Sequence, residues 1–172
     1  LHAYYNEYGS LALLAVLPGT SISHANTFVY GIATSANIPS EYKIVKNGAV
    51  IDPSGLKKYD VVTLDAANRQ ALVSDTRVSG RYSEGGPTVS YPQEVKVYGN
   101  SFRISDSAAA FFKDMKLKDY ITLLFDADGN VAAAYPRSTV SADMQGIVTA
   151  IDEGKATVTL TNGITLRNMD ID

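Results

Sequence analysis

Few residues in this 172-residue sequence have the types and spacing that catalysis requires. Ser54 and Lys57 match the S-x-x-K string of serine acylases, which needs a helix and companion motifs that this sequence lacks. Tyr42 and Lys46 have Y-x-x-x-K spacing, but no glycine-rich nucleotide loop accompanies them. Cysteine is absent, which excludes thiol nucleophiles and zinc–thiolate sites. We therefore predict a protein that is not an enzyme and takes no cofactor.

Metal-ligating residues are equally sparse. The two histidines, His2 and His24, lie in polar surroundings near the N-terminus, and we expect His24 to be a loop residue. The segment Asp126–Asn130 (DADGN) has part of a calcium-loop pattern, but its twelfth position is Arg137, where an EF-hand has Glu. A similar polar segment, Asp65–Asn68, indicates that turn chemistry explains both. We predict no metal site.

Tyrosine is the residue type that indicates binding. The sequence has 11 tyrosines and 5 phenylalanines but no tryptophan. Exposed tyrosines offer a large contact area at a low entropy cost. Tyr82 and Tyr91 flank a segment rich in Gly, Ser and Pro, so Arg81, Tyr82 and Tyr91 are the candidate residues of a carbohydrate-binding groove. The alternative is that these tyrosines only fill strand surfaces, where tyrosine is favoured in any case.

Short strands joined by polar turns must position these side chains. The stretch Leu56–Val73 has the pattern of a strand, a turn and a second strand, and similar stretches occur near residue 10 and near residue 126. Their turns open at Asn6, Asp65 and Asp126, which are 59 and 61 residues apart. A period near sixty residues is typical of repeated small units.

Other segments have clear local signals. Asn47-Gly48 predicts a hairpin over Tyr42–Ile51, because a type I′ turn needs positive φ at both central residues. Alternation predicts a second hairpin over 94–104 and three strands over 145–166. One short helix is expected near 105–115, capped by Ser105 or Asp106 and held by the burial of Phe111 and Phe112.

Together these signals predict a mainly β fold of tandem small barrel-like or sandwich-like units, each of about sixty residues. Residues 1–27 are the second half of a unit, 28–88 and 89–140 are full units, and 141–172 are the first half of a further unit. The two half-units either pack together or each remain unpaired. The chain is expected to be an excerpt of a longer protein.

Composition narrows the class of partner. The formal net charge is −3 and the pI about 5.3, without a basic stripe, which argues against nucleic acid. The apolar stretch Leu11–Leu17 is too short to span a bilayer, so membrane insertion is not expected. Neighbouring repeats of the same chain are the expected partners.

Three runs carry a family resemblance: NGAVIDPSGLKKYDVVTLDAANRQALVSDTRVSGRYSEG, VKVYGNSFRI and LKDYITLLFDADGNVAA. Across roughly Tyr42–Tyr135 the sequence resembles repeat regions of large surface proteins of Clostridia-like bacteria, which often carry S-layer homology domains. The resemblance implies a secreted, wall-associated protein whose β-rich repeats project from a Gram-positive cell. It supplies no catalytic positions, and the S-layer homology motif itself is not in this sequence.

Our principal hypothesis is therefore a non-catalytic stalk, assembly or adhesion module at the cell surface. The alternative is a carbohydrate-binding module for wall or host glycan, and a partner protein is a further option. A wall-active hydrolase would need paired carboxylates brought together in a cleft.

Overall fold

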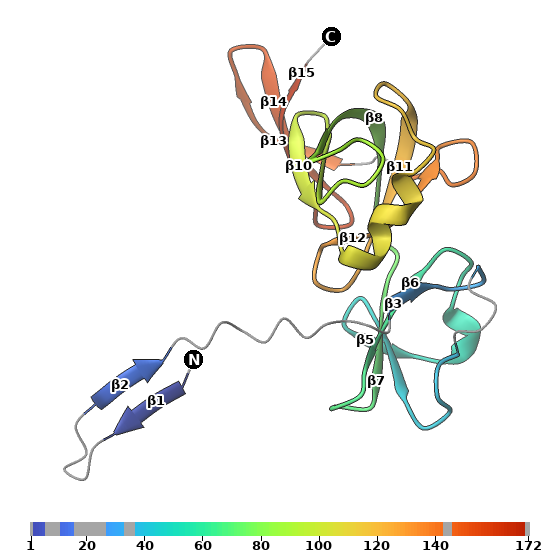
Figure 1. The fold of residues 1–172 in the computed structure, drawn as a ribbon, viewed down its shortest axis with the longest axis vertical. Coiled ribbons are helices and arrows are strands. Elements are labelled where there is room, and N and C mark those ends of the chain that lie inside the picture. The colour runs from blue at the N-terminus through green and yellow to red at the C-terminus, as the bar shows by residue number, and fades with distance from the viewer. Residues whose placement is uncertain (1, 6–10, 16–26, 33–36, 143–145, 171–172) are drawn as a thin grey trace.

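The computed structural model of the protein describes residues 2–5, 11–15, 27–32, 37–142 and 146–170. Within these residues the chain is mainly β, with its strands in four antiparallel or mixed sheets (Figure 1). The predicted β class is confirmed. None of the described sheets closes into a barrel, because each has two unpaired edge strands in its ladder.

Unit one is the first five-stranded sheet, with strand order β3-β6-β7-β4-β5. Its elements are β3 (Thr27–Val29), β4 (Lys43–Lys46), β5 (Ala49–Ile51), the 3₁₀ turn η1 (Pro53–Gly55), β6 (Val61–Asp65) and β7 (Gln70–Ser74). β4 and β7 are parallel, and the other neighbours are antiparallel. Asn47 and Gly48 have φ of 50° and 81°, so the predicted Asn-Gly hairpin is confirmed.

Unit two is the second five-stranded sheet, with strand order β10-β9-β8-β11-β12. Its elements are β8 (Arg77–Gly86), β9 (Glu94–Val97), β10 (Asn100–Arg103), the 3₁₀ helix η2 (Asp106–Phe112), β11 (Tyr120–Phe125) and β12 (Val131–Pro136). A single parallel bridge, Ile104 to Val131, brings the two edges together. The helix η2 lies between the third and fourth strands of this sheet, and the ladder itself stays open.

Two smaller sheets complete the described chain. The terminal sheet is a meander of β13 (Gly146–Asp152), β14 (Lys155–Leu160) and β15 (Thr165–Asp170). β1 (His2–Tyr5) pairs with β2 (Leu11–Ala15) in a two-stranded sheet. In the part of the chain that the structure describes, no strand ladder joins these two sheets.

The division between the units differs from the predicted boundary at residue 88. β8 belongs to unit two, so the sheets divide at the two residues between Ser74 and Arg77. A segment as rich in Gly, Ser and Pro as residues 81–92 is typical of a loop, but residues 81–86 belong to β8. Gly80 and Gly85 instead allow close packing within the sheet, since a Cβ at Gly80 would overlap the side chain of Val97.

The helix near 105–115 is present in shorter form as η2. Ser105 is its N-cap residue, but its hydroxyl donates to the carbonyl oxygen of Val131 at 3.1 Å instead of capping the helix. Phe112 is fully buried, whereas Phe111 is 38% exposed. The helix is therefore held by one buried face, in agreement with the expectation that a short helix needs packing.

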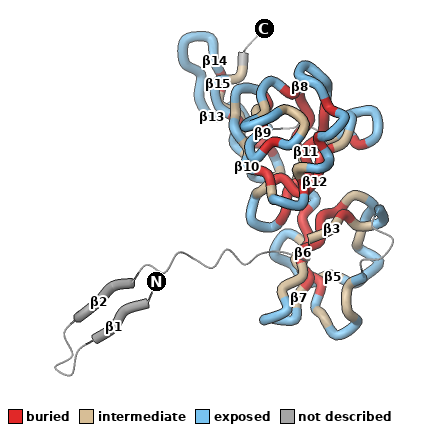
Figure 2. The backbone as a smooth tube through the Cα atoms, viewed as in Figure 1, coloured by how far each residue is buried: buried red, intermediate tan, exposed pale blue. Residues whose placement is uncertain are grey.

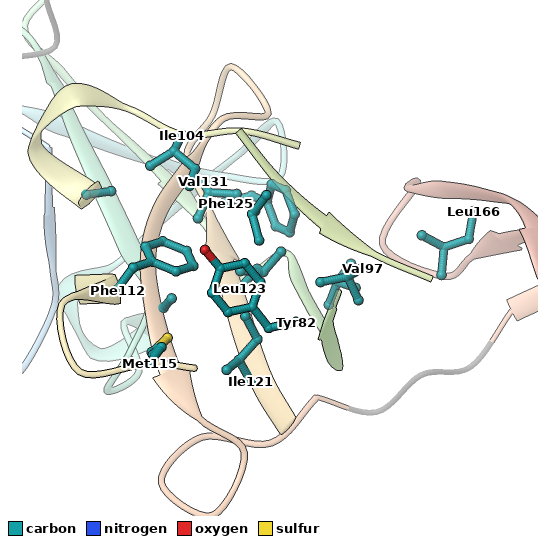
Figure 3. Packing of buried hydrophobic residues seen from close by; sticks show 14 of the residues in the cluster. Tyr82, Val97, Ile104, Phe112, Met115, Ile121, Leu123, Phe125, Val131 and Leu166 are labelled. Atoms are coloured by element: carbon teal, nitrogen blue, oxygen red, sulfur yellow. The ribbon is translucent and has the colours of Figure 1, made fainter. Parts of the chain in front are cut away.

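The main hydrophobic core lies in unit two and extends into the terminal sheet. Buried side chains of β8, β9, β11, β12 and η2 form it, and Leu160 and Leu166 of the terminal sheet join it (Figure 3). A second cluster connects the two units, with Val29 and Val61 packed against Leu124, Ala133 and Val140. Figure 2 shows buried segments continuing from β12 into β3.

The close packing at Gly80 gives a stability prediction. We expect Gly80→Ala to lower the free energy of unfolding by about 1–3 kcal/mol, because the added methyl group overpacks against Val97 and Tyr98. Gly86→Ala is the matched control, since among the described residues, apart from its chain neighbours, no atom lies within 4 Å of its Cβ position. Urea unfolding monitored by circular dichroism measures both; equal stabilities would contradict the packing described for β8.

Candidate functional site

The three predicted binding residues do not form one groove. Tyr82 is 0% exposed, and its ring packs edge-on against Phe112 with centroids 5.6 Å apart. Its hydroxyl donates to the carbonyl oxygen of Val89 at 2.7 Å, and burial raises the pKa of Tyr82 to about 12. The expectation that Tyr82 is exposed is therefore wrong: side chains alternate along β8, and position 82 faces the core.

Arg81 and Tyr91 are both exposed, but their contacts lie on different elements. The Arg81 guanidinium lies 4.8 Å from the ring centroid of Tyr120 on β11. Tyr91 is 51% exposed in the loop after β8, where its backbone N–H donates to the hydroxyl of Thr88. Arg81 thus contacts Tyr120, a residue that the sequence did not identify as a binding candidate.

One surface patch consists of Arg81, Tyr120 and Arg137, and we call it the Tyr120 surface. The guanidinium of Arg137, which follows β12, lies 5.7 Å from the same tyrosine ring. Tyr120 is 45% exposed. Tyr120 is the first residue of β11, and its two arginine neighbours come from β8 and from the residue after β12, which only the fold brings together.

A hollow of about 510 Å³ adjoins this surface. Aromatic and acidic side chains line it, among them Phe111, Asp114, Asp119, Tyr120 and Tyr135. The hydroxyl of Tyr135 is shielded from solvent and has no hydrogen-bond partner among the described residues. Burial, and then the neighbouring Tyr59, raise the pKa of Tyr135. The hollow therefore combines apolar ring faces with hydrogen-bond acceptors.

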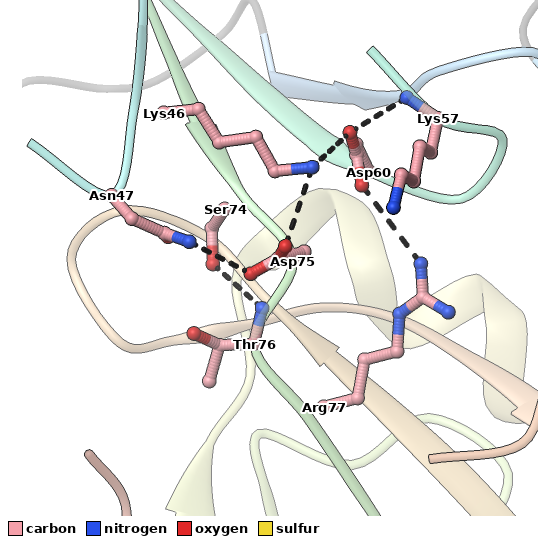
Figure 4. Close-up of polar contacts among 8 residues, drawn as sticks. All are labelled: Lys46, Asn47, Lys57, Asp60, Ser74, Asp75, Thr76 and Arg77. Carbon is pink, nitrogen blue, oxygen red and sulfur yellow. Dashed lines mark hydrogen bonds and ion pairs between the residues drawn. The ribbon is translucent and has the colours of Figure 1, made fainter. Parts of the chain in front are cut away.

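A buried charge cluster lies in unit one where it meets unit two (Figure 4). The carboxylate of Asp60 is 0% exposed and accepts hydrogen bonds from Lys46 Nζ and the backbone N–H of Lys57, each at 2.8 Å. The guanidinium of Arg77, the first residue of β8, lies 4.0 Å away. Asp75 also pairs with Lys46, at 3.3 Å. The carboxylate is thus compensated by groups from both sides of the junction.

The protonation states follow from this geometry. Burial by itself would lower the pKa of Lys46, but the hydrogen bond and charge of Asp60, with those of Asp75, outweigh it and raise that pKa. Burial would raise the pKa of Asp75, but bonds from Asn47 and Lys46 lower it. Both groups are therefore charged at neutral pH, as an ion-pair network requires.

The residues that match catalytic patterns in the sequence have structural roles in the fold. Ser54 lies in the 3₁₀ turn η1, which does not carry Lys57. Lys46 is bound to Asp60. Asp126 accepts N–H bonds from Asp128 and Asn130, and Asp65 accepts one from Asn68, so the turn interpretation of both acidic segments is confirmed.

A second hollow, of about 570 Å³, lies where three turns converge between the two units and the terminal sheet. The polar side chains of these turns bond within the protein. Asn47 donates to Asp75 at 3.1 Å, and Asn162 donates to the carbonyl oxygen of Arg77 at 2.8 Å. The contacts of Asn47 and Asn162 hold neighbouring elements together, so we interpret this hollow as part of the junction between these elements.

Other classes of site receive no support from the described part of the chain. Within it, no group of three or more His, Cys, Asp and Glu residues is placed to hold a metal ion. No described helix has the length and apolar character needed to cross a membrane. His24 lies outside the described residues. No known family model matches this sequence, and no curated protein matches it significantly.

The buried carboxylate gives a stability prediction. We expect Lys46→Ala to lower the free energy of unfolding by about 3–5 kcal/mol, because it leaves Asp60 buried with only a distant cation. Lys96→Ala is the matched control, because it removes an ion pair with Glu84 that is exposed to solvent and should change the stability little. Equal losses in chemical denaturation would contradict the role assigned to Asp60.

The lowered pKa of Asp75 gives a pH prediction. A carboxylate whose pKa is lowered by folding stabilises the protein above its unfolded pKa, near 3.8, and this contribution is lost as the pH falls through the lower folded value. Urea unfolding between pH 7 and pH 3 should therefore show a smaller acid loss in Asp75→Asn than in the unmodified protein. The difference stays below about 1 kcal/mol because the side chain is partly exposed. An identical acid loss in both proteins would contradict the assignment.

Proposed function

We propose that this chain is a non-catalytic module of tandem β units that acts as a rigid stalk or assembly segment of a bacterial cell-surface protein. The observation that carries the proposal is the junction between the units. Only two residues separate β7 from β8, and the apolar cluster around Val61 and Leu124 spans both units. This cluster and the Asp60 network together fix one unit on the next, as a stalk that transmits force requires.

Matching hydrogen bonds support the repeat. In unit one, the N–H of Tyr30 donates to the carbonyl oxygen of Asp60 at 2.8 Å, and the N–H of Tyr59 to that of Tyr30 at 2.9 Å. In unit two, the backbone N–H of Tyr82 donates to the carbonyl oxygen of Asp119 at 2.9 Å, and the N–H of Lys118 donates to the carbonyl oxygen of Tyr82 at 2.8 Å.

The match extends to side chains and backbone conformation. The carboxylate of Asp60 accepts the N–H of the residue three positions earlier, and so does that of Asp119, both at 2.8 Å. The residues before these aspartates, Tyr59 and Lys118, both have positive φ, of 70° and 77°. Hydroxyl pairs also recur: Thr27 with Thr63, and Ser79 with Thr122. These details support a common ancestral unit.

The smaller sheets match parts of unit two. The ladder of β8 with β9 shifts between Tyr82 and Glu84, and that of β13 with β14 shifts between Val148 and Ala150. Two residues before each shift lies a glycine, Gly80 or Gly146, whose Cβ would collide with a valine of the neighbouring strand. β13 and β14 therefore correspond to β8 and β9, the first two strands of unit two.

The β1–β2 hairpin corresponds in the same way to β11–β12. Its partners Ala3 and Leu14 lie 120 residues before the partners Leu123 and Ala134, and the register shifts after the next pair in both hairpins. An offset of 120 residues is two periods of sixty, which supports the predicted repeat length.

The cell-surface location rests on the sequence resemblance to surface repeats of Clostridia-like bacteria. An antibody raised against the purified protein should label intact, non-permeabilised cells of the source organism. Labelling that requires permeabilisation would contradict a surface location, and the structural role would then be sought inside the cell.

Coupling between the units gives the functional prediction. Val73→Ala removes core volume from unit one and should weaken it by about 1–2 kcal/mol. If the units unfold together, amide hydrogen exchange at Val95 in unit two should accelerate by about tenfold as well. Val50→Ala, at a 70% exposed position of unit one, is the control and should change neither. Faster exchange confined to unit one would contradict rigid coupling.

A further inference from the structure

We propose that the Tyr120 surface binds an anionic saccharide, a sugar ring that carries a carboxylate or phosphate group. The inference uses the repeat correspondence of the proposed function to locate the surface, and it adds a ligand to the module. Tyr120 would contact the apolar side of the sugar, and Arg81 and Arg137 would pair with its anionic group.

The first argument is a difference between equivalent positions. Val61 follows Asp60 as Tyr120 follows Asp119, and Val29 precedes Tyr30 as Arg81 precedes Tyr82. In unit one, Val29 and Val61 are 6% and 1% exposed, because they pack against unit two. In unit two, the same two positions carry an arginine and a tyrosine, and Tyr120 is 45% exposed. In unit one this face therefore packs against unit two, whereas the equivalent face of unit two is a polar aromatic surface.

The second argument is charge. Within the described residues, neither Arg81 nor Arg137 has an acidic side chain within ion-pair distance, although the protein as a whole carries a net charge of −3. Both guanidiniums lie within 6 Å of one ring centroid, at 4.8 Å and 5.7 Å. Arginine forks match the geometry of carboxylate and phosphate oxygens, so two of them beside one ring favour an anionic group.

The third argument is shape. The hollow of about 510 Å³ beside Tyr120 is in the size range of small-molecule sites. The rings of Phe111 and Tyr120 contribute apolar area to its lining, and the carboxylates of Asp114 and Asp119 are acceptors for hydroxyl groups. A ligand with one anionic group and several hydroxyls satisfies these side chains together, and an aliphatic ligand does not.

The test is isothermal titration calorimetry of the full chain with three oligosaccharides of equal length. Hexagalacturonate carries carboxylates, a phosphorylated mannohexaose carries phosphates, and maltohexaose is neutral. We expect at least one anionic probe to bind at about 1 mM or below, more weakly in higher salt, and maltohexaose not to bind. The two anionic probes decide which group the arginines prefer.

Variants locate the site. Tyr120→Ala and the double variant Arg81→Gln/Arg137→Gln should each weaken binding of the anionic probe by about tenfold or more. Arg103→Gln removes an exposed arginine of the same unit elsewhere, and Tyr91→Ala tests the other exposed tyrosine predicted from sequence; both should retain affinity. No binding by either anionic probe, equal binding of maltohexaose, or loss only in Tyr91→Ala would each overturn the proposal. None of these outcomes bears on the coupling of the units.

Discussion

The burial of one carboxylate organises the junction between the two units. Asp60 is inaccessible to solvent, so its charge must be compensated within the protein. Lys46 reaches it from β4, the backbone of Lys57 from the preceding turn, and Arg77 from the start of β8. Because Arg77 belongs to unit two, the arrangement that compensates the charge of the carboxylate also fixes where the second sheet begins.

Apolar packing makes the same connection on the neighbouring face. Val29 and Val61 of unit one contact Leu124, Ala133 and Val140, so the outer face of one sheet is covered by the next. Tyr59 and Tyr135 extend this contact with an edge-on ring pair at 5.3 Å. Charge compensation gives the junction its specific geometry, and hydrophobic burial supplies most of its favourable free energy.

Local signals in the sequence predicted the strands well. Asn47-Gly48 and the alternation around residues 94–104 are short-range patterns that specify hairpins by themselves, and both hairpins are present. The limits of β8 could not be predicted in this way. Glycines are typical of a loop, but in β8 Gly80 leaves room for Val97 of the neighbouring strand, and Gly85 leaves room for the Tyr82 hydroxyl of β8 itself.

The binding surface was predictable only in part. Arg81 was identified from sequence and is exposed, whereas Tyr82 points into the core because neighbouring residues of a strand face opposite sides. Tyr120 and Arg137 join Arg81 through the pairing of β8, β11 and β12, which no local pattern reports. The ion pair of Asp60 was equally hard to predict, because nothing near Asp60 in the sequence identifies Lys46 as its partner.

The measurement that tests rigid coupling most directly is a distance distribution between the units. The chain has no cysteine, so Ala67→Cys in unit one and Lys113→Cys in unit two, both exposed, place two spin labels cleanly. Double electron–electron resonance should give one narrow distance in this background and a broad distribution when Leu124→Lys is added. A broad distribution without Leu124→Lys would contradict the account, because the units would then be flexibly joined.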